Sequence, residues 1–233
     1  MAGRSQRFLD AGYGEAKYRL DLGGKSVFTH AVESFRAQFE SHQFLFIVAA
    51  EAADFVREAS LSLGVRAARV VALTAPTSGQ AETVELGLSG EGDDTPLTIF
   101  NIDTFRPGFA FPGPWYDALD GWLEVFEGQG ANWSYVRPAP GDAPLALETA
   151  EKQPISNLCC TGLYHFARAG DFRAALAQER AAPQARELYV APLYNHLIAR
   201  GARIGYSKIA RDEVIFCGTP QEYQDLIRPV SPS

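Results

Sequence analysis

Small and basic side chains stand together in the opening segment, and such a combination can bind phosphate groups. They are Gly3, Ser5, Arg7 and Lys17. A loop of small residues lets backbone N–H groups approach a phosphate, while arginine and lysine add fixed positive charge. An ordinary N-terminus with glycine-rich turns explains the same residues, so the pattern alone is weak evidence. Gly24-Lys25-Ser26 does not complete a P-loop, because Arg19 stands where the first glycine belongs, and we expect a turn before a helix there.

A carboxylate follows a hydrophobic run near the middle of the chain. The run at 97–102 is interrupted by Asn101, and Asp103 comes directly after it. Open α/β sheets bind ligands at the carboxyl ends of their parallel strands, and an aspartate there is a good oxygen ligand for Mg²⁺. A plain turn aspartate is the alternative. Two polar residues in a hydrophobic run favour the functional interpretation.

Two further segments carry polar residues at the ends of predicted elements. Residues 77–83 open a helix after a strand, where free N–H groups can contact a base or a phosphate, although a plain N-cap explains them equally well. Glu151 and Lys152, followed by Ser156-Asn157 and Thr161-Gly162, could bind sugar hydroxyls and a phosphate. Exposed loop charges are the alternative explanation for the first pair.

The elements that position these residues alternate between strand and helix in the first half of the chain. Short β-branched or aromatic runs predict buried parallel strands, and apolar residues at helical spacing predict the helices between them. The predicted strands are 43–49, 69–73 and 97–102, and the predicted helices are 26–39, 51–63 and 79–88. This alternation predicts an α/β fold with a doubly wound, mostly parallel sheet.

The second half predicts a small mixed or antiparallel extension of that sheet. Strand-like runs cover 121–127, 133–137, 145–149 and 158–166, helical runs cover 171–181 and 187–200, and a strand pair at 203–207 and 213–216 precedes a short helix after Thr219-Pro220. No linker long enough to separate two domains is visible, so we expect one domain over residues 1–233.

Composition limits the class of protein. The chain has 233 residues, of which 46% are hydrophobic, enough for one sizeable core. Its net charge of −7 leaves no global basic field for nucleic acid. No apolar run long enough for a membrane span or a signal core is visible, so we expect a cytoplasmic protein that binds no membrane. Cys159, Cys160 and Cys217 lack metal-ligand spacing, and we interpret the first two as small residues of a buried strand.

Taken in order, several short motifs resemble those of the sugar-phosphate nucleotidyltransferases. The motifs are Met1-Ala2-Gly3-x-Ser5-x-Arg7-Phe8 with Lys17, Gly79-Gln80-Ala81-Glu82-Thr83, Asn101-Ile102-Asp103, Glu151-Lys152, Thr161-Gly162-Leu163-Tyr164 and Gly218-Thr219-Pro220. Asn132-Trp133-Ser134-Tyr135 and the segment 187–195 are most similar to the branch found in capsular polysaccharide gene clusters. Each motif is weak alone, but their order and spacing span nearly the whole chain.

The resemblance implies a GT-A-like fold, an NTP and a phosphorylated acceptor as partners, and Mg²⁺ as cofactor. It implies catalytic roles for Arg7, Lys17 and Asp103, with Asp103 also holding the metal. The residues implied to bind the nucleotide are Ala2, Gly3, Ser5, Thr74, Gly79 and Gln80, and those implied to bind the acceptor are Glu151, Lys152, Asn157, Thr161 and Gly162. The nucleotide half would cover roughly 1–105 and the acceptor half 106–233. The implied reaction transfers a nucleoside monophosphate to a sugar 1-phosphate and releases pyrophosphate.

Three departures from the family pattern stand out. Ala16 replaces the proline that usually precedes the lysine, so the loop has lost a rigid residue. Phe216 stands two residues before Gly218-Thr219-Pro220, where a second metal-binding aspartate is common, and we expect Asp212 or Glu213 to substitute. Similar proteins also carry a hydrophobic strand immediately before the Met-Ala-Gly loop. That strand would lie in the middle of the sheet, so we expect the true start of the chain to lie upstream.

Two other functions stay open. A GT-A glycosyltransferase usually has Asp-x-Asp at its metal site, whereas Asn101-Ile102-Asp103 has one aspartate, and this function leaves Arg7 and Lys17 unexplained. A non-catalytic homologue that binds a nucleotide or a sugar is supported by Ala16, by Phe216 and by the missing strand before the Met-Ala-Gly loop. The residue pattern identifies neither the nucleobase, nor the acceptor, nor the oligomeric state.

Overall fold

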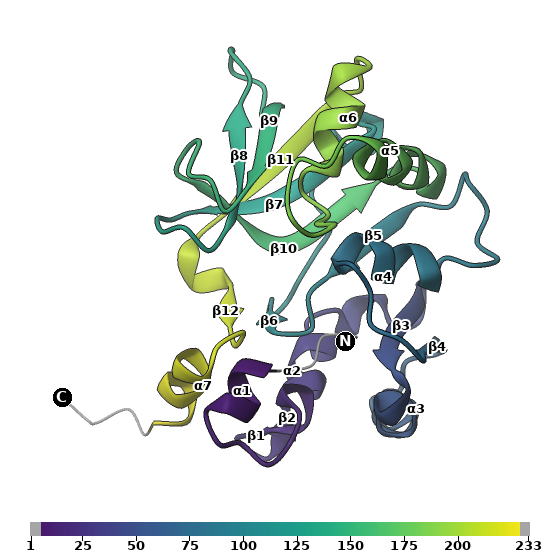
Figure 1. Cartoon of the computed structure of the whole chain (residues 1–233), viewed down its shortest axis with the longest axis vertical. Helices are drawn as coiled ribbons and strands as arrows, with labels where there is room; N and C mark the ends of the chain where they lie inside the picture. The colour runs from purple at the N-terminus through teal and green to yellow at the C-terminus, as the bar shows by residue number, and fades with distance from the viewer. Residues whose placement is uncertain (1–5, 229–233) are drawn as a thin grey trace. The chain divides into compact units, whose positions relative to one another are not determined.

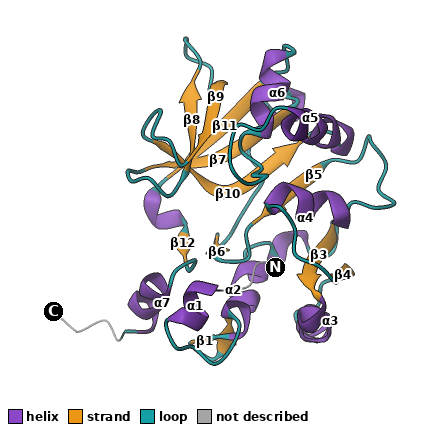
Figure 2. Cartoon of the chain, viewed as in Figure 1, coloured by secondary structure: helices purple, strands orange, loops and turns teal. Residues whose placement is uncertain are grey.

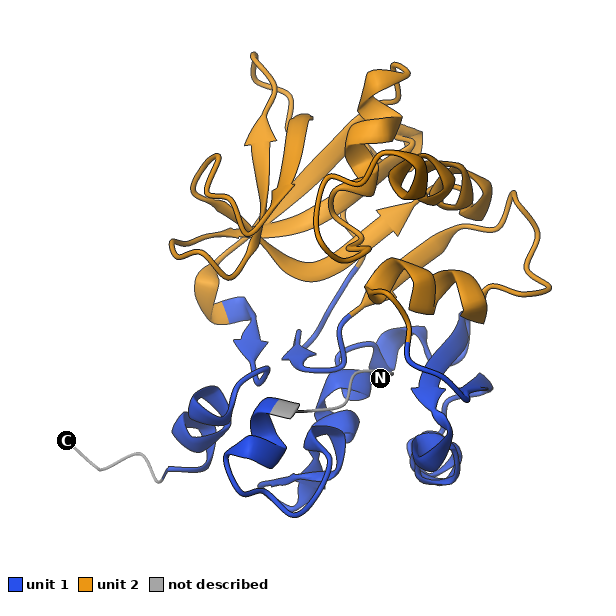
Figure 3. Ribbon diagram, viewed as in Figure 1, with its two compact units in different colours: residues 1–76, 101–110, 213–233 blue, residues 77–100, 111–212 orange. Residues whose placement is uncertain are grey.

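The computed structural model describes residues 6–228 and divides them between two compact units (Figure 3). Unit 1 takes the ranges 1–76, 101–110 and 213–233, and unit 2 takes 77–100 and 111–212. The chain therefore leaves unit 1 and returns to it twice. Each unit combines strands and helices (Figure 2), as an α/β protein should.

Unit 1 combines short helices with a two-stranded parallel sheet and two antiparallel strand pairs (Figure 1). Its helices are α1 (Gln6–Asp10), α2 (Val27–Glu33), α3 (Ala53–Ser62) and α7 (Pro220–Ile227), with short 3₁₀ turns η1 (Lys17–Arg19), η2 (Arg36–Gln38) and η3 (Ala50–Ala52). Its strands are β1 (Asp21–Leu22), β2 (Lys25–Ser26), β3 (Gln43–Ala49), β4 (Ala67–Leu73), β6 (Thr104–Phe105) and β12 (Ile215–Phe216). Strands β3 and β4 run parallel and are connected through α3, which makes them a βαβ unit.

Aromatic packing holds unit 1 together at two places. Phe28 of α2 lies 5.4 Å from Phe46 of β3 and 5.8 Å from Phe55 of α3, measured between ring centroids. Phe8 of α1 lies 6.3 Å from Tyr223 of α7, so the beginning and the end of the described chain pack against each other. Buried aromatic pairs of this kind stabilise beyond their buried area by about 0.5–1.5 kcal/mol each.

Unit 2 is built on a mixed sheet whose strand order is β11-β7-β10-β8-β9, with β5 also paired to β10. The strands are β5 (Leu97–Phe100), β7 (Gly121–Glu127), β8 (Ser134–Pro138), β9 (Ala146–Glu151), β10 (Leu158–Phe166) and β11 (Ile204–Ile209). Only β11 and β7 run parallel among the pairs described in this sheet. The helices are α4 (Gln80–Gly87), α5 (Ala169–Ala181) and α6 (Leu193–Ala199), with η4 (Tyr116–Ala118), and η5 (Arg211–Glu213) lies at the boundary of the units.

Most predicted elements are confirmed, and the strand at 43–49 has the predicted bounds. Three predictions are wrong. The run at 97–102 was predicted as a parallel strand, but β5 covers only Leu97–Phe100 and pairs antiparallel with β10. The runs at 203–207 and 213–216 do not pair with each other, because β11 pairs with β7 and β12 pairs with β6. The predicted helix 187–200 begins only at Leu193, because Pro192 disfavours helical backbone at the residue before it and Leu188 instead bonds to the start of α4.

Two smaller expectations are also confirmed. Gly23 and Gly24, both with positive φ, close the hairpin of β1 and β2, and Ser26 then caps α2 by accepting a hydrogen bond from the Thr29 amide. All three cysteines are free and buried. Within residues 6–228, none of the helices is long and apolar enough to cross a membrane.

Candidate functional site

The predicted cation and the predicted strand-end carboxylate meet in unit 1. Nζ of Lys17 donates to Oδ2 of Asp103 at 2.6 Å, and both side chains are mostly shielded from solvent, with exposed fractions of 16% and 29%. Lys17 also lies 5.9 Å from the centroid of the Phe8 ring. Burial raises the pKa of the Asp103 carboxyl, but the ammonium of Lys17 outweighs it and leaves that pKa below its ordinary value. Asp103 is therefore a carboxylate at neutral pH.

Local structure fixes both partners. Lys17 begins the 3₁₀ turn η1, and Ala16 before it has the extended conformation φ −65°, ψ 139° that proline also adopts. Asp103 lies in the short connection between β5 and β6, and its carbonyl accepts a hydrogen bond from the Cys217 amide at 2.8 Å. Strand β12, which pairs with β6, therefore brings the Gly-Thr-Pro motif to Asp103.

The Gly-Thr-Pro motif forms the start of α7. Thr219 caps this helix, and the Glu222 carboxylate accepts hydrogen bonds from the amides of Gly218 and Thr219, both at 2.9 Å. A Cβ at Gly218 would lie 3.3 Å from Oδ2 of Asp103 and 3.6 Å from the Glu222 carboxylate. Because glycine has no Cβ, the backbone at position 218 can lie this close to the carboxylates of Asp103 and Glu222. The sequence reasoning did not single out Glu222, although its place three residues after Thr219 is the signal of a capping box.

A divalent metal fits the carboxylate of Asp103. Mg²⁺ is usually held by one or two carboxylates together with water and substrate phosphates, so a single partly exposed aspartate is an adequate protein ligand. No cluster of three metal-ligating side chains occurs within the described part of the chain. Asp212 is exposed on η5 and belongs to unit 2, and Phe216 pairs with Thr104, so the second metal ligand stays a prediction.

Within residues 6–228, unit 1 contains two further predicted site residues, Arg7 among the catalytic ones and Thr74 among the nucleotide-binding ones. Arg7 is exposed on α1, next to the buried Phe8, and Thr74 is exposed directly after β4. Ala2, Gly3 and Ser5 lie outside the described residues.

In unit 2, Gly79 and Gln80 begin α4 as predicted. Gly79 has a φ of +154°, and a Cβ there would lie 2.5 Å from the carbonyl oxygen of Leu188. The Leu188 amide donates to the carbonyl of Ser78, and its carbonyl accepts from the amide of Ala81 at 2.8 Å. The start of α4 is thus bonded to a segment more than a hundred positions later in the sequence.

The predicted acceptor pair Glu151 and Lys152 ends β9. The carboxylate of Glu151 is 9% exposed and accepts a short hydrogen bond from the Ser134 hydroxyl, and burial raises its pKa above the ordinary value. Lys152 is half exposed, and its Nζ donates to the hydroxyl of Tyr189 at 2.5 Å. The sequence reasoning named neither Ser134 nor Tyr189 as a site residue, although both lie in segments that carried the resemblance.

The other predicted acceptor residues lie on or beside β10. The hydroxyl of Thr161 is buried and donates to the Glu124 carboxylate at 2.9 Å, so it supports the strand from within. Gly162 has a φ of +95° at the irregularity where the register of β10 shifts against β7. Asn157 is exposed before β10 and its carbonyl accepts from the Gly128 amide.

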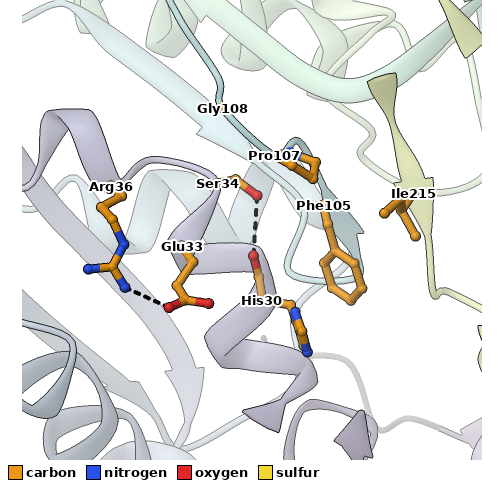
Figure 4. Close-up of a pocket in the computed structure, with 8 residues that line it drawn as sticks. All are labelled: His30, Glu33, Ser34, Arg36, Phe105, Pro107, Gly108 and Ile215. Carbon is orange, nitrogen blue, oxygen red and sulfur yellow. Dashed lines mark hydrogen bonds and ion pairs between the residues drawn. The ribbon is translucent and has the colours of Figure 1, made fainter. Parts of the chain in front are cut away.

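A cavity of about 280 Å³ lies elsewhere in unit 1 (Figure 4). It is lined by His30, Glu33, Ser34, Arg36, Phe105, Pro107, Gly108 and Ile215, none of which is a predicted site residue. The carboxylate of Glu33 in this lining is already paired. It accepts hydrogen bonds from Arg36, which also lines the cavity, and from Lys25, which does not. This cavity therefore adds nothing to the predicted site.

Comparison with known proteins places the chain among nucleotidyltransferases. A crystal structure of the nucleoside-diphosphate-sugar pyrophosphorylase from Vibrio cholerae RC9 is 49% identical, with 98% of each chain covered and a TM-score of 0.93. An inositol-1-phosphate CTP transferase from T. maritima shares the fold at 12% identity, with 99% of this chain and 95% of that chain covered and a TM-score of 0.73. A UDP-glucose pyrophosphorylase in complex with UDP-glucose does so at 13% identity, with 96% and 93% covered and a TM-score of 0.75. Neither a protein-family model nor a curated protein matches.

Proposed function

The chain belongs to the family of nucleoside-diphosphate-sugar pyrophosphorylases, and from this premise we propose that it transfers a nucleoside monophosphate from an NTP to a sugar 1-phosphate. Identity of 49% over nearly the whole of both chains supports the reaction class. Within this chain, the observation that carries the proposal is the contact of Lys17 with Asp103, because it joins a partly buried cation to a strand-end carboxylate.

The proposed reaction forms no covalent bond between the substrates and the protein. An oxygen of the acceptor phosphate forms a bond to the α-phosphorus of the NTP, the bond from that phosphorus to the bridging oxygen breaks, and pyrophosphate leaves with its electron pair. Negative charge accumulates on the phosphates during this exchange, so positioning and neutralisation are the main needs. In this proposal the ammonium of Lys17 and the guanidinium of Arg7 would supply positive charge, and Gly3 and Ser5 would supply backbone N–H donors.

Asp103 would hold Mg²⁺, with Asp212 as the proposed second ligand. When bound, the metal would neutralise phosphate charge and orient the phosphates. The low pKa of Asp103 keeps its oxygens available as acceptors at neutral pH. In the described structure Oδ2 of Asp103 accepts a hydrogen bond from the ammonium of Lys17, and this contact supports a shared role for the two side chains.

Unit 2 carries the residues proposed to select the substrates. Gly79 and Gln80 would contact the nucleobase, with Thr74 of unit 1 as a further nucleotide contact. Glu151 would accept hydrogen bonds from sugar hydroxyls, and Lys152 would bind the acceptor phosphate. Asn157, Thr161 and Gly162 would shape the pocket around the sugar.

The proposal also covers the product and the place where it is made. The product would be a nucleotide sugar made in the cytoplasm for capsular polysaccharide, in keeping with the segments at 132–135 and 187–195. Nucleic acid and membranes have no part in it.

Pyrophosphate release tests the proposal. The purified chain is mixed with each of four NTPs and a panel of sugar 1-phosphates, with and without Mg²⁺. Release that needs both the metal and the acceptor is the expected result. NTP binding without turnover would instead identify a non-catalytic homologue, and transfer of sugar from a nucleotide sugar would identify a glycosyltransferase.

Two variants of the opening segment sharpen this test. Lys17→Met removes the ammonium from Asp103 while keeping a long side chain, and it should lower kcat about 100-fold or more. Lys25→Met is the matched control. Lys25 pairs with Glu33, which lines the cavity of Figure 4 and is not a predicted site residue, so this substitution should leave turnover unchanged.

A further inference from the structure

Lys152 is held in an unusual backbone conformation. It has a φ of +57° and is the only residue other than glycine with a positive φ within the described ranges. Its amide nevertheless donates to the carbonyl of Trp133 at 2.9 Å, so the conformation is fixed by neighbouring backbone. Left-handed backbone is unfavourable for any residue with a Cβ, and such strain persists only where the surrounding structure imposes it.

The side chain of Lys152 is held as firmly as its backbone. Its Nζ donates to the hydroxyl of Tyr189 at 2.5 Å and lies 4.5 Å from the centroid of the same ring. The two contacts combine a charged hydrogen bond with a cation–π interaction. The neighbouring carboxylate of Glu151 is farther from Nζ, at 3.9 Å. Tyr189, rather than the adjacent acid, therefore determines where the ammonium lies.

Tyr189 is itself anchored. The residue before it, Leu188, bonds through its amide and its carbonyl to Ser78 and Ala81 at the start of α4. The amide of Tyr189 donates to the carbonyl of Glu187 at 3.0 Å, which makes a tight local turn. The segment from Glu187 to Tyr189 thus has a fixed backbone on which the aromatic ring can act as a support.

We propose that Tyr189 is a positioning residue that aims the ammonium of Lys152 at the phosphate of the acceptor. The inference rests on the proposed function, because it takes Lys152 as the phosphate-binding cation. An ammonium has three N–H donors, and Tyr189 engages one of them. The side chain of Lys152 is 49% exposed, so donors remain accessible to a ligand.

The arrangement also limits how closely the ammonium pairs with nearby carboxylates. Both Glu151 and Glu187 act electrostatically on Lys152. The ion pair of Lys152 with Glu151 is long, at 3.9 Å, whereas the contact with the Tyr189 hydroxyl is 2.5 Å. A neutral hydroxyl holds the ammonium without cancelling its charge, so Tyr189 leaves Lys152 more attractive to a phosphate dianion than a close carboxylate pair would.

Kinetics with glucose 1-phosphate, or whichever sugar 1-phosphate gives turnover, test the proposal. Tyr189→Phe keeps the ring and removes the hydroxyl, and it should raise the acceptor KM about three- to ten-fold while the NTP KM stays unchanged. Tyr189→Ala removes both contacts and should raise the acceptor KM further. In a Lys152→Met background, Tyr189→Phe should have no additional effect on the acceptor KM. Tyr116→Phe is the matched control, since it deletes a hydroxyl that donates to the Tyr206 carbonyl in the same unit.

A chemical measurement on the protein without substrates separates this inference from the proposed function. Lys152 acetylation by an N-hydroxysuccinimide ester, followed by peptide mass spectrometry, should be about three- to ten-fold faster in Tyr189→Phe than in the parent chain. If no sugar 1-phosphate gives turnover, the proposed function fails, and the acetylation rate still decides whether Tyr189 holds Lys152. Unchanged acetylation together with an unchanged acceptor KM overturns the inference. An equal rise in both KM values overturns it too, because that pattern indicates a general structural role.

Discussion

The ammonium of Lys17 lies 2.6 Å from Oδ2 of Asp103, although the two residues lie in separate loops of unit 1. The contact is maintained from both sides, by the turn η1 around Lys17 and by the hydrogen bond of Cys217 to the Asp103 carbonyl. In the proposed function, Lys17 would exchange Asp103 for a phosphate and Asp103 would exchange Lys17 for a metal ion, and neither side chain would need to move far.

Asp103→Asn tests the carboxylate directly. The amide keeps the shape and can accept a hydrogen bond from Lys17, but it removes the negative charge that a metal needs. We expect turnover to fall at least about 100-fold and the Tm to fall modestly, because Lys17 keeps a hydrogen-bond acceptor but loses its counter-charge. Pyrophosphate release and thermal unfolding measure the two quantities. An active Asp103→Asn protein would show that the metal binds elsewhere.

Ala16→Pro should stabilise the chain. Ala16 already has the φ that proline requires, and its amide has no hydrogen-bond acceptor among the described residues, so the substitution restricts mainly the unfolded state. We expect the free energy of unfolding to rise by about 0.4–1 kcal/mol. Ala16→Gly at the same site should lower it. Urea unfolding of both variants provides the comparison, and a destabilised proline variant would mean that the loop changes shape around Lys17.

Sequence reasoning predicted the elements better than their connections. The hydrophobic run 43–49 has one interpretation, a buried strand, and its bounds were correct. The runs at 203–207 and 213–216 contain β11 and the short β12, but which strands these join depends on long-range packing that periodicity does not encode. Pro192 was a visible signal that the helix predicted at 187–200 should begin late.

The site was predictable to a similar extent. Residue type and order pointed to Lys17 and Asp103, and the structure brings them together. The role of Tyr189 depends on side-chain geometry between segments that are distant in sequence, and spacing alone carries no information about it. The positive φ of Lys152 was equally invisible, since lysine has no preference for that conformation.

Gly79 should tolerate no side chain. A Cβ there would overlap the Leu188 backbone at 2.5 Å, in addition to the unfavourable φ. Gly90→Ala separates the two effects, because Gly90 has a φ of +88° and no heavy atom within 4 Å of the added Cβ. We expect Gly79→Ala to lower the free energy of unfolding by about 1–3 kcal/mol more than Gly90→Ala does. Equal effects in urea unfolding would show that Leu188 moves away freely.

His165 should make the chain sensitive to acid. Its ring stacks on Trp122 and bonds to Thr98, and burial lowers its pKa to about 4 from an ordinary value of 6.5. Below about pH 6.5 the unfolded state binds a proton at this histidine, whereas the folded state does not bind it until the pH approaches 4. The free energy of unfolding therefore falls as the pH drops toward 4. The loss should reach at most about 3 kcal/mol. His165→Gln should remove this part of the pH dependence in urea unfolding, whereas His42→Gln, at an exposed site, should retain it.

Lys152 offers a direct measure of the strain at the proposed acceptor site. Glycine adopts a φ of +57° without the steric conflict that any Cβ causes, whereas alanine keeps the conflict but, like glycine, loses the ammonium and its contacts with Tyr189. Lys152→Gly should therefore be more stable than Lys152→Ala by about 1 kcal/mol, and both should lose binding of the acceptor phosphate to a similar degree. Urea unfolding gives the first quantity and the acceptor KM gives the second. If the alanine variant were the more stable one, the backbone at Lys152 would relax when the side chain is removed, and its conformation would depend on Tyr189 rather than on the bond to Trp133.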